Sequence, residues 1–102
     1  MVLKEDRHSP LLKRIGHRFR NPKLLTEALT HSSAKGEGRP SNERLEFFGD
    51  SVLGLVVSEE LLRRYPDLQE GDLTQRKSAL VSRTALAKIA QKIGIYKHLT
   101  IG

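Results

Sequence analysis

Hydrophobic side chains recur along this 102-residue chain at the spacing of amphipathic helices, three or four positions apart. Leu11, Leu12 and Ile15 form the first such group, and Phe19 follows four residues later. No run of four or more residues alternates apolar and polar side chains between turn residues, as a half-buried strand would. The pattern therefore predicts an all-α protein, in which residues 1–102 form a single helical bundle.

A second helix is predicted to begin at Asn21-Pro22. An Asn side chain can cap the free amide groups of a first turn, and Pro fits the first helical position. Apolar residues continue at helical spacing to about His31. The following residues, 32–41, are rich in Gly, Ser and Pro and predict a flexible loop.

A long helix is predicted over residues 42–64, ending before Pro66, because proline disfavours helical geometry at the residue before it. Residues 67–71 are expected to form a turn. Asp72 is a candidate cap for a helix over residues 73–81.

The last predicted helix covers residues 83–93. Ser82 is placed to cap its first turn, and Gly94 is placed to end it in the left-handed conformation that glycine adopts without strain.

The long helix carries an acidic face. At 100° per residue, Glu43, Glu46 and Asp50 lie within about 60° of one another. Apolar residues occupy much of the remaining circumference, which is typical of a central, buried helix; they are Leu45, Phe48, Val52, Leu53, Leu55, Val56 and Val57. Carboxylates beside a core need an arginine partner, a proton or a bound cation.

Two interpretations of this face stay open. Acids at helical spacing are often a solvated face paired with Lys or Arg. A divalent cation would instead relieve the repulsion among the three carboxylates, and Mg²⁺ prefers oxygen ligands. Gly49 and Gly54 each weaken a helix interior by about 1 kcal/mol relative to alanine. They indicate close approach by another helix or a ligand, although ordinary helix packing explains them equally well.

Charge is distributed in three blocks. The chain has 18 Lys and Arg against 12 Asp and Glu, a formal net charge of +6. Residues 1–40 carry +5, residues 41–72 carry −5 and residues 73–102 carry +6. Basic segments can bind the phosphates of a nucleic acid. The acidic segment between them would repel phosphates unless a metal ion is bound to its carboxylates. The five cations of the last two helices are interpreted first as solvated and second as phosphate contacts: Arg76, Lys77, Arg83, Lys88 and Lys92.

Composition excludes several classes of protein. The absence of cysteine excludes disulfides, thiolate metal sites and thiol nucleophiles. Aromatic residues make up 5% of the chain, too few for base stacking as the main mode of binding. No apolar run is long enough to span a membrane, and the charged first ten residues do not resemble a signal peptide. We therefore expect a cytoplasmic protein with no membrane partner.

Residues 42–53, NERLEFFGDSVL, closely resemble the signature of the ribonuclease III family. Residues 29–33 (LTHSS) and 70–74 (EGDLT) resemble the motifs that flank it, in the same order, and the likeness covers about residues 10–102. The resemblance implies a helical endonuclease domain that cleaves double-stranded RNA with Mg²⁺, or Mn²⁺ in its place. It further implies a homodimer that acts in the processing of RNA, including rRNA and mRNA precursors.

The resemblance also implies roles for individual residues. Glu46 and Asp50 match catalytic positions that bind the metal. Glu43 and Glu70 match two further acids of the cleft, which contact substrate or metal-bound water. Phe47 matches an aromatic residue that packs into the partner subunit.

The family supplies two more carboxylates, an Asp and a Glu, from a later helix, and usually a double-stranded-RNA-binding domain. Residues 1–102 contain neither, so we expect a partial catalytic domain, truncated on its C-terminal side. Three hypotheses follow: a metal-dependent endoribonuclease, a non-catalytic dimerising RNA-binding fragment, and a plain helical interaction domain with a solvated acidic face. The first two differ in cleavage, and the third predicts neither Mg²⁺ nor RNA binding.

Overall fold

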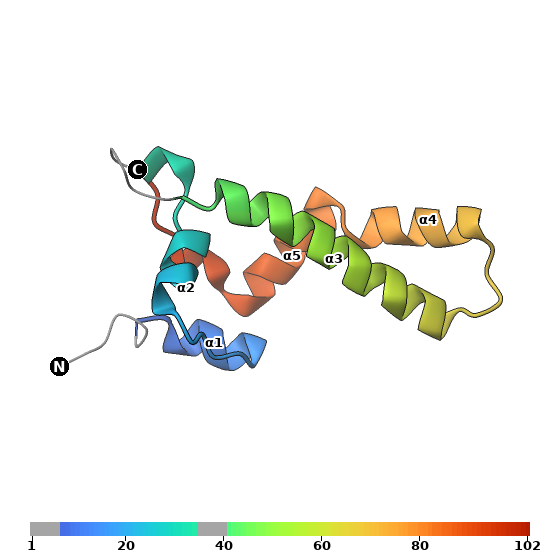
Figure 1. The fold of residues 1–102 in the computed structure, drawn as a ribbon, viewed down its shortest axis with the longest axis horizontal. Coiled ribbons are helices and arrows are strands. Elements are labelled where there is room, and N and C mark those ends of the chain that lie inside the picture. Colours follow the sequence, from blue (N-terminus) through green and yellow to red (C-terminus); the bar gives the residue numbers. More distant parts are fainter. Residues whose placement is uncertain (1–6, 35–40) are drawn as a thin grey trace.

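The computed structural model describes residues 7–34 and 41–102 and is helical, as the sequence predicted (Figure 1). Its elements are α1 (Ser9–Ile15), α2 (Pro22–Ala28), η2 (Ser32–Ala34), α3 (Glu43–Arg64), α4 (Glu70–Leu80), α5 (Arg83–Ile93) and η3 (Ile95–His98). Within the described part, the only strand-like pairing outside helices is an isolated parallel bridge between Thr30 and Thr100. Most of the predicted loop, residues 35–40, lies outside the described residues.

The core lies where α1, α2 and the C-terminal end of α5 meet (Figure 1). Leu11, Leu25 and Leu29 are buried at its centre. Side chains from both ends of the chain pack around them; these are Leu12, Phe19, Ile93, Ile95 and Leu99. The core therefore joins the N-terminal and C-terminal thirds of the sequence and leaves α3 and α4 as an extension.

The helix ends that depend on local side chains are confirmed. Asn21 Oδ1 accepts a hydrogen bond from the Lys23 amide at 3.0 Å. Ser82 Oγ accepts one from the Ala85 amide at 3.1 Å. Gly94 ends α5 with a φ of +72°. Such caps satisfy amide and carbonyl groups that a helix leaves without intrahelical partners.

The predicted end of α2 is wrong by a few residues. The helix ends at Ala28 instead of about His31. The backbone leaves the helix because it pairs with the C-terminal residues: the His31 amide donates to Thr100 O at 2.9 Å, and the Thr100 amide donates to Leu29 O at 2.9 Å. These residues are about 70 positions apart in the chain, so the local sequence around α2 could not predict their pairing.

The predicted start of α4 is also wrong. The helix begins at Glu70, with Gln69 as its N-cap, so Asp72 lies inside the first turn and is not the cap. Negative side chains are stabilising in a first turn because the helix dipole is positive there. Glu70 and Asp72 together therefore extend the helix toward the preceding turn.

α3 is not the buried central helix that its composition predicted. Among the described helices it packs against α4, which lies beside its C-terminal half, and against α2 (Figure 1), and only Leu61 is buried. Large apolar side chains of α3 are exposed where no described element covers them, among them Phe47, Phe48, Leu55, Val56 and Leu62. An apolar helix surface is buried only where a neighbour covers it.

Among the described residues, no helix combines the length and the apolar composition needed to cross a membrane.

Candidate functional site

Glu46 and Asp50 lie one helical turn apart on α3, and both side chains are exposed. Residues four positions apart on a helix are neighbours on its surface. Both carboxylates are solvated. The free-energy cost of burying a charge, which a central and buried α3 would have imposed, therefore does not arise. The pair can therefore present oxygen atoms to the same ligand from one face.

Glu43 occupies the first turn of the same helix. The start of α3 is tied to the end of α2, since the Asn42 amide donates to Thr30 O at 2.8 Å. Ser41 Oγ donates to Glu43 Oε1 at 3.4 Å. This end of the helix is positive, so the dipole favours the two acids of the first turn, Glu43 and Glu46.

Glu70 is not brought together with these acids. It begins α4, at the far end of the α3–α4 hairpin from the start of α3 (Figure 1). The hairpin register places Lys77 against Gly54. At a rise of 1.5 Å per residue, Glu70 then lies roughly 16 Å from Asp50 along the hairpin. Its role in a cleft stays a prediction.

The residues present fit a divalent ion in part. No group of three or more His, Asp or Glu side chains is placed to hold a metal in residues 7–34 and 41–102. Mg²⁺ is usually bound by one or two carboxylates together with waters and substrate phosphates. Glu46 and Asp50 can supply such a pair, and no third carboxylate of the described chain joins them.

Phe47, between the two acids in sequence, has 81% of its side chain exposed. It is exposed on α3 and does not contribute to the core. Its position is suited to contact with another chain, but the contact stays a prediction.

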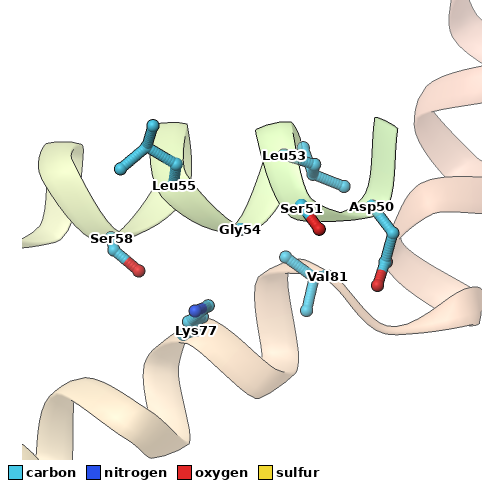
Figure 2. Close-up of a pocket in the computed structure, with 8 residues that line it drawn as sticks. All are labelled: Asp50, Ser51, Leu53, Gly54, Leu55, Ser58, Lys77 and Val81. Carbon is cyan, nitrogen blue, oxygen red and sulfur yellow. The ribbon is translucent and has the colours of Figure 1, made fainter. Parts of the chain in front are cut away.

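An open cleft of about 360 Å³ lies between α3 and α4 (Figure 2). Its lining residues come mostly from α3; they are Asp50, Ser51, Leu53, Gly54, Leu55, Ser58, Lys77 and Val81. Asp50 thus shares a cleft with Lys77, which the sequence alone led us to interpret first as a solvated cation and second as a phosphate contact. The only sequence signal was Gly54, and its meaning depends on the register of the hairpin.

Comparison with known proteins identifies the family. A family model described as Ribonuclease-III-like matches residues 21–102. The chain belongs to the ribonuclease III family. It is 49% identical over 94 residues to Ribonuclease 3 of Dinoroseobacter shibae, with 92% of this chain and 41% of the relative covered. It is 52% identical over 88 residues to Ribonuclease 3 of Rhodopirellula baltica, with 86% and 33% covered.

Solved structures agree with this assignment to the ribonuclease III family. A nuclease domain of ribonuclease III from Campylobacter jejuni, described for structural flexibility in a region involved in dimer formation, has a TM-score of 0.87 and 38% identity. That alignment covers 93% of this chain and 65% of the other. A second structure of the same nuclease domain has a TM-score of 0.85 and 37% identity, with 98% and 65% covered. The chain therefore spans about two-fifths or less of the two curated relatives.

Proposed function

We propose that this chain forms part of a metal-dependent endoribonuclease that cleaves double-stranded RNA in RNA processing, including that of rRNA and mRNA precursors. Family membership supports the reaction class. The observation that carries the proposal is the placement of Glu46 and Asp50, both exposed and one turn apart on the signature helix. A cytoplasmic location belongs to the same proposal and rests on the family alone.

In this proposal Glu46 and Asp50 hold Mg²⁺, or Mn²⁺ in its place, through carboxylate oxygens. An ion held by these carboxylates would supply the activation of a water for attack on phosphorus and the stabilisation of the leaving oxygen. Solvent exposure of both side chains leaves room for a phosphate group beside them. Glu43 and Glu70 are the further acidic positions assigned to substrate or metal-bound water.

The charge of the C-terminal segment supports an RNA substrate. Residues 73–102 carry six Lys and Arg and no acid. Cationic side chains bind phosphates with release of counterions, so the affinity falls as salt rises. Double-stranded RNA is recognised mainly by shape, 2′-hydroxyls and phosphates, and little sequence preference is expected.

The proposal includes a homodimer. Phe47 and its apolar neighbours on α3 form a surface that no described element covers. A second copy of the chain is the partner proposed for this surface, with Phe47 as the central contact. The description of the Campylobacter jejuni nuclease domain also refers to a region involved in dimer formation.

A cleavage assay tests the proposed reaction. The purified chain is incubated with end-labelled duplex RNA and Mg²⁺, with single-stranded RNA of the same sequence as a second substrate. We expect cleavage of the duplex that EDTA and Asp50→Asn both abolish. Glu59→Gln, which removes another exposed acid of α3, is the matched control and should cleave normally.

The second candidate is a non-catalytic, dimerising RNA-binding fragment. It is favoured by one observation, that the described residues supply no group of three metal-binding side chains. This alternative predicts salt-sensitive binding of duplex RNA with no cleavage under any of these conditions. Cleavage that survives Asp50→Asn would contradict both candidates, since it would come from another site or from a contaminant.

A further inference from the structure

We propose that Lys77 is a phosphate-binding residue of the α3–α4 cleft, where its ammonium group holds a phosphate of the RNA duplex in the space that Asp50 also lines. The choice of RNA as the source of that phosphate rests on the proposed function. The anion site itself follows from the geometry of the cleft.

Lys77 reaches from α4 toward α3, opposite Gly54 (Figure 2). The side chain is half-buried. Its Nζ atom lies 3.6 Å, and its Cε atom 3.7 Å, from the position that a β-carbon on Gly54 would occupy. The missing side chain at residue 54 therefore leaves the ammonium group room against α3.

No described carboxylate pairs with this ammonium. In residues 7–34 and 41–102, no Asp or Glu lies within 4.0 Å of Lys77 Nζ, whereas Glu60 is paired with both Arg63 and Arg64. The neighbouring Arg76 is turned away, with its guanidinium 4.4 Å from the centre of the Tyr65 ring. A half-buried cation without a counter-charge attracts an anion, because the reduced solvation strengthens the interaction.

The rest of the cleft suits a phosphate group. The hydroxyl groups of Ser51 and Ser58 line the same space and can donate to phosphate oxygens. Asp50 lies one turn from Gly54, about 6 Å along the helix. A phosphate bound by Lys77 therefore lies in the same cleft as the carboxylate that we assign to the metal, with the Val81 side chain between them in the view of Figure 2. Lysine is a common phosphate ligand that acts as a point charge.

The position of Lys77 can be tested apart from its charge. Gly54→Leu places a bulky side chain where the lysine chain now extends, without changing the net charge of the protein. Lys77→Gln removes the charge, and Lys77→Arg retains it. Lys13→Gln on α1 is the matched control, because it removes one exposed cation from a helix that does not line the cleft.

The first measurement is a titration with inorganic phosphate, followed by NMR. We expect saturable shifts of the Gly54 and Lys77 amide signals in the wild type and in Lys13→Gln. These shifts should be absent in Lys77→Gln and reduced in Gly54→Leu. Circular dichroism and thermal melting establish that each variant is folded.

The second measurement is the affinity for a short RNA duplex over a range of salt concentrations. Lys77→Gln should weaken binding about tenfold, as expected for the loss of one hydrogen bond to a charged group. It should also reduce the slope of log K against log salt by about 1, while Lys77→Arg stays close to wild type. Lys13→Gln should change the affinity much less.

The two proposals fail in different ways. Phosphate shifts that persist in Lys77→Gln, or that the wild type never shows, overturn the assignment of Lys77. Normal RNA binding and cleavage by Lys77→Gln would likewise overturn it and leave the nuclease proposal standing. Lys77-dependent phosphate shifts in a chain that neither binds nor cleaves duplex RNA would support the anion site and contradict the nuclease proposal.

Discussion

The Lys77 ammonium lies 3.6 Å from the point where a β-carbon on Gly54 would stand. This is an ordinary van der Waals distance, so an alanine fits at residue 54 without displacing the lysine. Gly54→Ala should raise the free energy of unfolding by up to about 1 kcal/mol, because glycine weakens a helix interior. Urea denaturation measures this change.

Gly49→Ala is the control for that substitution, since nothing lies within 4 Å of a β-carbon there. Both variants should gain similar stability. A loss of stability in Gly54→Ala alone would mean that the cleft is tighter than the structure shows.

The His8 and His98 rings form a contact whose strength should depend on pH. Their Nδ1 atoms are 2.7 Å apart, so one nitrogen donates to the other and the contact requires a neutral ring. Burial lowers the pKa of His8 below its usual 6.5, and the charges of His98 and Arg7 lower it further. The unfolded chain therefore binds more protons than the folded chain just below pH 6.5, and stability should fall as the pH decreases through this range.

Thermal melting at about pH 7.5 and about pH 5.5 tests this expectation. The loss of melting temperature at the lower pH should be smaller in His8→Gln than in the wild type. His17→Gln, which changes an exposed histidine, should keep the wild-type pH dependence. An equal loss in His8→Gln and wild type would exclude this contact as the source.

Phe47 should matter for association and not for the stability of one chain. Because 81% of its side chain is exposed, Phe47→Ala should change the free energy of unfolding of the monomer by less than about 0.5 kcal/mol. Sedimentation velocity should show a dimer for the wild type and a shift toward monomer for Phe47→Ala. Tyr96→Ala, at another exposed aromatic residue, should remain dimeric. The same mass for all three proteins would contradict the proposed contact.

The cap at the start of α5 gives a local test of the fold. Ser82→Ala leaves the Ala85 amide without its acceptor and should lower the free energy of unfolding by about 1 kcal/mol. Ser82→Asp should retain most of the stability. Ser78→Ala, at an exposed position inside α4, should stay within about 0.5 kcal/mol of wild type. Equal effects of the two alanine substitutions would mean that the cap is not stabilising.

Local chemistry explains what could be predicted from sequence. Asn21, Ser82 and Gly94 act on their own helix ends, so the starts of α2 and α5 and the end of α5 were predicted correctly. The motif over residues 42–53 identified the family, which the comparisons confirm. Glu46 and Asp50 remain candidates on that basis, with a placement on α3 that suits the role.

Tertiary contacts explain what could not be predicted. The end of α2 depends on pairing between residues 29–31 and Thr100. The exposure of α3 depends on which neighbours are present, because its apolar composition alone suggested a core helix. The pairing of Gly54 with Lys77, and the separation of Glu70 from Asp50, both depend on the register of the α3–α4 hairpin.

The metal site can be tested most directly without an activity assay, by adding Mn²⁺ to the isotope-labelled chain and recording the broadening of its amide signals. We expect the broadening to be centred on residues 46–50 and to be lost in Glu46→Gln and Asp50→Asn. It should persist in Glu59→Gln, and excess Mg²⁺ should reverse it. Broadening that is unchanged by both substitutions, or centred on residues 67–72, would contradict the assignment of Glu46 and Asp50 as metal ligands.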